Sequence, residues 1–188
     1  RIAAVMFMGA FPYAAIISFI RIYSDELGLN QGALFFIFMA IGVAVARLLV
    51  GKVMDRKGPT GIVVIGLLVT IIGLIWLKYT DSFWPFMMCG VLVGMGNGLI
   101  MPTVQTMALN IVPIERRGAA NATFFSAVDL GIGAGSIALG YVAEYYGIDT
   151  MFFICGLILL LPLAFYFLFV RNHYYRQLEL LKKEEHNG

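Results

Sequence analysis

The chain has little charge and almost no cysteine. Only 13% of its 188 residues are charged, about half the share that is usual in soluble domains. Thirteen basic and eleven acidic residues give a net charge of +2, which is too small to favour nucleic acid as a partner. The two cysteines, Cys89 and Cys155, lie inside long apolar stretches, so there is neither a disulfide framework nor a paired-thiol metal motif. A secreted disulfide-rich protein is therefore excluded.

Long hydrophobic runs fill most of the chain. Hydrophobic residues make up 61% of it and the mean hydropathy is +0.89, which is typical of an integral membrane protein. A helix needs roughly 20 apolar residues to cross the hydrocarbon core, and six segments approach or exceed this length: 2–20, 30–46, 58–77, 82–114, 118–143 and 151–170. Their continuous apolar character argues against a transmembrane barrel. The sequence predicts an all-α polytopic fold, with a six-helix transmembrane domain over residues 1–170 and a polar tail over residues 171–188.

Basic residues in the connections predict the orientation. They gather on one side of the predicted bundle, at Arg1, Lys52, Arg56, Lys57, Arg116, Arg117, Arg171, Arg176, Lys182 and Lys183. The positive-inside rule makes this side cytoplasmic, and an even number of crossings then places both termini in the cytoplasm. We expect a plasma membrane protein, such as one of the bacterial inner membrane. Because the first residue is not Met, we also expect a piece of a longer protein.

The connection between the second and third helices combines glycine, carboxylate and arginine at close spacing. Gly51 allows close packing or a helix end, and Asp55 can accept hydrogen bonds from the amides of a neighbouring helix N-terminus. Arg56 can pair with an acidic partner, and Gly58 ends the segment. These contacts predict a gating turn, whereas the simpler interpretation is a basic turn that only fixes orientation.

A second group of residues precedes and enters the fifth helix. Arg116, Arg117, Gly118 and Asn121 are followed by Ser126, Asp129 and the glycines at 131, 133, 135 and 140. Together with residues 51–58, with the segment Gly-Met-Gly-Asn-Gly at 94–98 and with Pro102, this pattern resembles the carboxyl-terminal six-helix half of a major facilitator superfamily transporter. It is most similar to the drug:proton antiporter branch, although that family has basic residues where Pro59 stands. The resemblance covers essentially the whole chain and implies two inverted three-helix repeats.

Asp129 is the predicted proton-coupling residue. It follows Gly118 by eleven residues, so it lies roughly 16 Å into a hydrocarbon core about 30 Å thick. An aspartate at that depth costs about 2.5 to 3.5 kcal/mol, so we expect it to face the bundle interior or a wet cavity. A structural carboxylate bound to hydroxyls or to an arginine is the alternative. Arg47 lies only about 6 Å from the helix end at Gly51, so we expect it to reach the headgroups or brace the turn rather than pair with Asp129.

Three polar side chains are candidates for a substrate cavity. Asn97 and Gln105 lie on the fourth predicted helix, and their amides can both donate and accept hydrogen bonds. Tyr13 follows Pro12 on the first helix. Hydrogen bonds between helices, or packing in the case of Tyr13, are equally compatible with these residues. Glycines spaced by four residues predict close helix packing; they are Gly90, Gly94 and Gly98 on the fourth helix and Gly131 and Gly135 on the fifth.

The resemblance implies half of a proton-coupled secondary transporter that exports drugs or small metabolites by alternating access. Its partners would be the amino-terminal six-helix half, the lipid bilayer, a small-molecule substrate and protons, with no cofactor, metal or nucleic acid. An uptake symporter for a sugar or metabolite and a homodimeric carrier made of two copies are the alternatives. An intramembrane enzyme would need clustered His, Glu, Cys or Ser at membrane depth, whereas Asp129 is the lone ionisable group near the midplane. The tail could form a short interfacial helix or remain disordered.

Overall fold

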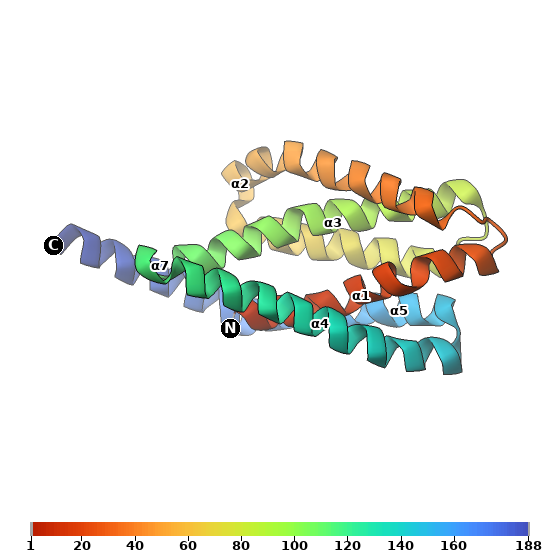
Figure 1. Cartoon of the computed structure of the whole chain (residues 1–188). Coiled ribbons are helices and arrows are strands. Elements are labelled where there is room, and N and C mark those ends of the chain that lie inside the picture. The colour runs from red at the N-terminus through yellow and green to blue at the C-terminus, as the bar shows by residue number, and fades with distance from the viewer. Residues whose placement is uncertain (1, 188) are drawn as a thin grey trace.

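The computed structural model describes residues 2–187, with side chains described everywhere except at 52, 53, 55–57 and 181–187. Within the described residues the fold is entirely helical (Figure 1). Six helical spans are long and apolar enough to cross a membrane: Ile2–Glu26, Gly32–Gly51, Gly58–Leu77, Phe83–Asn110, Ile114–Tyr146 and Ile148–Leu180. The prediction of an all-α polytopic fold with six spans is confirmed.

The helices follow one another with short connections. α1 covers Ile2–Glu26, α2 covers Gly32–Leu77, α3 covers Phe83–Asn110 and α4 covers Arg117–Tyr146, which is preceded by a 3-10 turn, Ile114–Arg116. The sixth span comprises α5 (Ile148–Ile158), α6 (Leu160–Phe165), a π-helical turn (Tyr166–Val170) and the start of α7 (Arg171–Asn187). The polar tail thus continues the sixth span as a helix.

α2 contains two of these spans, which run in opposite directions (Figure 1) and are connected by residues 52–57. The backbone stays helical through residue 57, and only Gly58 departs, with φ 64° and ψ −176°. Glycine adopts a positive φ without steric cost, and Pro59 suits the first position of the next span because its missing N–H would be unpaired there anyway. The connection that the sequence predicted over residues 51–58 is thus helical, and it ends at Gly58.

Glycines bring the helix backbones close together. The first span of α2 packs on α3, where a Cβ at Gly90 would lie 3.0 Å from the carbonyl oxygen of Phe35 and a Cβ at Gly98 would lie 2.9 Å from the Cβ of Ala46. Gly94 faces the backbone of Met39 in the same interface. Because lipid is as apolar as the side chains, such van der Waals packing replaces the hydrophobic effect as the force between membrane helices.

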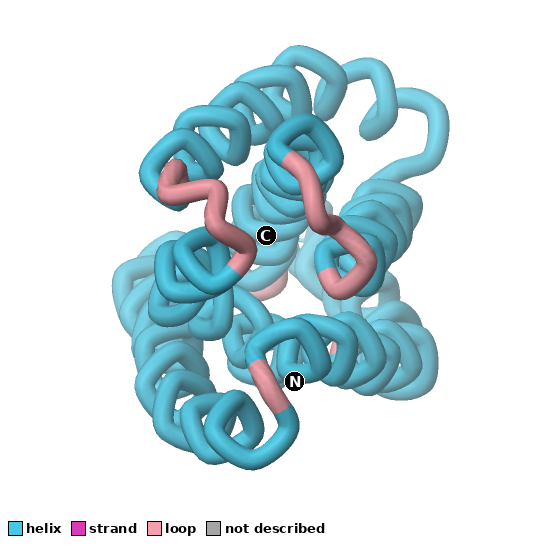
Figure 2. The backbone as a smooth tube through the Cα atoms, turned by 90° about the vertical axis from the view of Figure 1, so that its right-hand side faces the viewer, coloured by secondary structure: helices cyan, strands magenta, loops and turns pink. Residues whose placement is uncertain are grey.

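α1 packs on α4 in the same manner. A Cβ at Gly131 would lie 2.5 Å from the carbonyl oxygen of Phe7, and a Cβ at Gly135 would lie 3.0 Å from the Cα of Phe11. Figure 2 looks along the bundle and shows the helices side by side, with the loops at the near end. All five glycines that the sequence marks for packing therefore lie in helix interfaces.

Both ends of the described chain lie toward one end of the bundle (Figure 1), which also carries Gly58, Arg117 and Arg171 and is called the basic end below. Here the sixth span is tied to α2, because the hydroxyl of Tyr166 donates to the Oγ1 of Thr60 at 3.1 Å. The hydroxyl of Tyr175 lies 3.3 Å from the same Thr60 oxygen. The tail helix α7 thus contacts α2 two residues after its reversal.

Candidate functional site

A cavity of about 370 Å³ opens among four helices in the half of the bundle nearer the basic end. Its walls include all three side chains that the sequence marks for a substrate cavity, Tyr13 from α1 and Asn97 and Gln105 from α3. Arg47 and Thr70 of α2 add further polar groups. The volume falls within the range of about 300 to 1,000 Å³ that is common for small-molecule sites.

Local sequence shapes this cavity. Gly9 and Gly98 line it, and the lack of a side chain at these positions leaves room between α1 and α3. Pro102 also lines it and lacks a backbone N–H, so it interrupts the helical hydrogen bonding of α3. The hydroxyl of Thr106 donates to the Pro102 carbonyl at 2.8 Å. The wall of α3 is thus built from residues that weaken a regular helix and give it an irregular surface.

A hydrogen bond fixes Gln105 at the edge of the cavity. Its Nε2 donates to the Oδ1 of Asn121 on α4 at 2.8 Å, and both side chains are partly buried. Sequence reasoning noted Asn121 only as part of a motif and assigned it no contact. An amide side chain one turn into α4 indicates a hydrogen bond between helices. Its partner could not be predicted, because that depends on how α3 and α4 are each rotated about their own axes.

Arg47 lines the cavity together with Asn97 and Gln105, and its side chain is exposed. That it reaches the headgroups or braces the turn stays a prediction. Within the described residues, its guanidinium has no hydrogen bond and no ion pair. In the same part of the chain it forms no pair with Asp129, as the difference in depth predicts.

Asp129 does not line the cavity, although its neighbour Val128 does. The Asp129 side chain is exposed on the outer face of α4. It shares this face with Ala122, Ser126 and Gly133, which are exposed at intervals of three or four residues. Among the described residues its carboxylate has neither a hydrogen bond nor an ion pair. Asp129 therefore sits beside the cavity, on a face of small and polar residues.

The residues predicted to form a gating turn lie at the basic end. Gly51 and Gly58 bound the helical connection of α2, while Arg116 and Arg117 are exposed at the start of α4. The side chains of Asp55 and Arg56 lie outside the described part of the chain. The structure thus describes the backbone of the predicted turn but not its two central charges.

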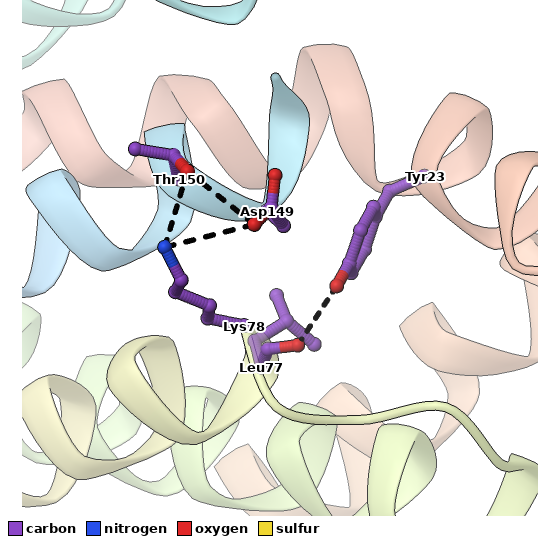
Figure 3. Close-up of polar contacts among 5 residues, drawn as sticks. All are labelled: Tyr23, Leu77, Lys78, Asp149 and Thr150. Carbon is purple, nitrogen blue, oxygen red and sulfur yellow. Dashed lines mark hydrogen bonds and ion pairs between the residues drawn. The ribbon is translucent and has the colours of Figure 1, made fainter. Parts of the chain in front are cut away.

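At the other end of the bundle a polar cluster joins three helices (Figure 3). The Nζ of Lys78 donates to the Oγ1 of Thr150 at 3.1 Å and lies 3.7 Å from the Oδ2 of Asp149. The hydroxyl of Tyr23 donates to the carbonyl of Leu77 at 3.1 Å. These contacts connect the end of α2 to the start of α5 and to α1. None of them was predicted from the sequence.

The helix arrangement and the sequence can be compared with known proteins. A family model described as "Major Facilitator Superfamily" matches residues 2–186, nearly the whole chain. The chain belongs to the Major Facilitator Superfamily. This confirms the resemblance at the level of the superfamily, and it makes the chain part of a family of membrane transporters.

Relatives within the superfamily are longer than this chain. An uncharacterized MFS-type transporter of Pseudomonas aeruginosa (strain UCBPP-PA14) is 31% identical over 157 residues, which are 84% of this chain and 39% of the relative. The staphylopine export protein of Staphylococcus aureus (strain Mu50) is 25% identical over an alignment of 174 residues, and the match covers 87% of this chain and 42% of the relative. The chain thus spans less than half the length of these superfamily members.

Solved structures show a similar fold. A POT family transporter in complex with 5-aminolevulinic acid matches with a TM-score of 0.76 at 21% identity, over 90% of this chain and 37% of that chain. Another, in complex with a thioalcohol-conjugated peptide, matches with a TM-score of 0.77 at 21% identity, over 92% of this chain and 38% of that chain. At this identity the match concerns the fold alone.

Proposed function

We propose that this chain is the carboxyl-terminal six-helix half of a proton-coupled secondary transporter that exports small molecules by alternating access. The observation that carries the proposal is the cavity of about 370 Å³, walled by polar side chains of three different helices, in a superfamily chain that spans less than half the length of its relatives. A matching half would close this cavity from the other side. Both termini would lie in the cytoplasm, since the basic end carries them.

The exposed face of α4 supports a partner half. Asp129 stands there without a polar contact among the described residues, and a charged residue facing lipid at this depth costs about 2.5 to 3.5 kcal/mol. The neighbouring Ala122, Ser126 and Gly133 are small, so another helix could approach the α4 backbone closely. We infer that the amino-terminal half covers this face. A second copy of this chain is the alternative, which the greater length of the relatives disfavours.

Proton coupling would run through Asp129. Its carboxylate can bind and release a proton, and Val128, the residue before it, forms part of the cavity wall. A change of charge at Asp129 would alter the contact between the two halves next to the bound substrate. Such a change can bias the equilibrium between inward-open and outward-open states, because a proton that binds the two states differently shifts their populations.

The gating turn would control the cytoplasmic entrance. The residues of this predicted turn lie at the basic end; those described are Gly51, Gly58, Arg116 and Arg117. Asp55 and Arg56 would add charges that could form ion pairs with the other half of the transporter. The helical connection that ends at Gly58 gives this entrance a short and stiff border. Breaking and remaking contacts at this border would accompany each transport cycle.

The direction of transport is supported by one relative, whose name describes export of staphylopine. Uptake of a sugar or another metabolite is the competing direction. The two are distinguished by the sign of proton movement when substrate is added to vesicles that hold a proton gradient. An exporter of this kind exchanges protons for substrate, whereas a symporter moves both in one direction.

The decisive experiment uses the full-length transporter in proteoliposomes with an imposed proton gradient. A pH-sensitive dye inside the vesicles reports proton movement as a panel of amphipathic cations, anions and neutral compounds is added. Asp129→Asn should abolish gradient-driven transport and keep substrate exchange without a gradient, because the binding cavity is intact while the titrating group is lost. Glu144→Gln is the matched control, since Glu144 is an exposed carboxylate near the other end of the same helix. Uphill transport by the Asp129→Asn protein would refute the coupling role.

A further inference from the structure

Arg47 brings the one formal charge into the described wall of the cavity. The other side chains that line the cavity in this chain are apolar or neutral. Arginine stays protonated at any physiological pH, so this wall is positive whatever the proton gradient does. A substrate that binds in this cavity must therefore be compatible with a permanent positive charge in its wall.

The guanidinium is available to a ligand. Within the described residues the ion pair that the structure contains, between Lys78 and Asp149, lies at the opposite end of the bundle. No described carboxylate or carbonyl accepts a hydrogen bond from Arg47. The side chain of Arg47 is exposed in this chain and also lines the cavity, so its donors are not enclosed by protein.

The neutral polar groups of the wall can both donate and accept hydrogen bonds, whereas Arg47 can only donate. Tyr13 and Asn97 have no hydrogen-bond partner among the described residues, so a hydroxyl and an amide NH₂ can both donate to a ligand. The hydroxyl of Thr70 already donates to the carbonyl of Gly66 at 2.9 Å. The Nε2 of Gln105 is likewise engaged, by Asn121. With the five N–H groups of Arg47, the free groups favour a ligand that is rich in acceptors.

The rest of the wall is apolar. Val5, Met6, Leu67, Met101 and Phe125 contribute to it, and their side chains suit a hydrocarbon or aromatic body. Methionine adapts to ligands of different shape because its side chain is unbranched and polarisable. The wall therefore combines a cationic, donor-rich part with an adaptable apolar part.

We propose that Arg47 binds the carboxylate of the substrate and that the substrates of this transporter are amphipathic organic acids. The planar guanidinium matches a carboxylate with two parallel hydrogen bonds, and Tyr13 and Asn97 complete the coordination of its oxygens. The apolar wall holds the body of the acid. The inference rests on the proposed transport function and names the substrate class of the same cavity.

The test measures binding and needs no transport. The full-length protein in lipid nanodiscs is titrated with benzoate and 4-phenylbutyrate, and with the primary amide of each, while tryptophan fluorescence and thermal unfolding report binding. The amide keeps the shape of the acid and lacks its charge. We expect each acid to bind at least tenfold more tightly than its amide.

Three variants test whether the preference for acid over amide depends on Arg47. Arg47→Gln should raise the Kd of the acids at least tenfold and leave the Kd of the amides within about twofold. Arg47→Lys keeps the positive charge but loses the planar guanidinium that can form two parallel hydrogen bonds, so it should weaken acid binding about threefold. Arg21→Gln is the matched control, since Arg21 is an exposed arginine on α1 near the other end of the bundle and does not line the cavity, and it should change nothing.

Several results would overturn the proposal. They are equal binding of acid and amide by the wild type, an equal loss of both ligands in Arg47→Gln, and no binding of either acid at millimolar concentration. The comparison of acid with amide uses the wild type alone, so it decides the matter even if a variant fails to fold. Failure here with proton-driven transport of other compounds would leave the transporter proposal standing, whereas acid binding without any proton-coupled transport would refute that proposal and keep this one.

Discussion

Gly131 on α4 offers a sharp test of the helix packing described above. A Cβ at this position would lie 2.5 Å from the carbonyl oxygen of Phe7 and 2.7 Å from the Cβ of Ala10, both on α1. Gly133, two residues along the same helix, has nothing within 4 Å of its added Cβ. The substitutions Gly131→Ala and Gly133→Ala therefore make the same chemical change in a closed and in an open place.

The magnitude follows from these distances. A carbon normally stays about 3.3 Å or more from a carbonyl oxygen, so at Gly131 the two helices must separate by about 0.8 Å. A gap of this size forfeits roughly a quarter to a half of each dispersion contact it opens, and overpacking of this kind typically costs 1 to 3 kcal/mol. The better helix propensity of alanine returns up to about 1 kcal/mol. We expect Gly131→Ala to lower the free energy of unfolding by up to about 2 kcal/mol, Gly133→Ala to leave it unchanged or raise it, and the two variants to differ by about 1 to 3 kcal/mol.

The assay is reversible unfolding of the full-length protein in mixed micelles, followed by circular dichroism. A difference of about 2 kcal/mol between the two variants corresponds to about a 30-fold difference in the unfolding equilibrium constant. Equal stability of the two variants would show that α1 and α4 do not meet at Gly131, and would refute the packing. A larger loss at Gly133 would place the partner helix on the wrong face of α4.

Two further predictions concern polar contacts. Asp149→Asn should lower the free energy of unfolding by less than about 1 kcal/mol, because the side chains of its ion pair with Lys78 are 28% exposed at Lys78 and 45% exposed at Asp149. Unfolding at 0.1 M and 1 M salt checks this, and a loss of stability that does not shrink at 1 M salt would contradict it. Asn121→Ala removes the acceptor of the Gln105 amide, and a double-mutant cycle with Gln105→Ala should give a coupling of about 0.6 to 1 kcal/mol, whereas a coupling near zero would mean that this bond does not form in the membrane.

The spans could be predicted from the sequence because each is an apolar run close to the thickness of the bilayer. The connection between the second and third spans was predicted over residues 51–58 and lies between the spans that end at Gly51 and begin at Gly58. Its helical backbone was not predicted. Residues 52–57 contain no glycine or proline and can remain helical, and only Gly58 departs from helical geometry.

The sequence predicted the membrane depth of the candidate site residues but not the direction in which their side chains point. Tyr13, Asn97 and Gln105 were chosen because they are polar side chains within apolar spans, and all three line one cavity. Which way a side chain points depends on the rotation of each helix. These helices are apolar nearly all round, so the sequence carries no periodic signal for that rotation. For this reason the contacts of Arg47 and Asp129 could not be predicted from the sequence.

The contacts at the two ends of α2 also bear on the mechanics of the bundle. The second span of α2 is joined to the sixth span by Lys78 at one end and by Thr60 at the other. Contacts at both ends oppose sliding and splaying of these two spans relative to each other, and so favour their moving together. The first span of α2 and α3 meet instead through a smooth, glycine-lined surface, and no side-chain hydrogen bond joins them among the described residues. The bundle therefore has a stiff frame on one side and a surface suited to sliding on the other.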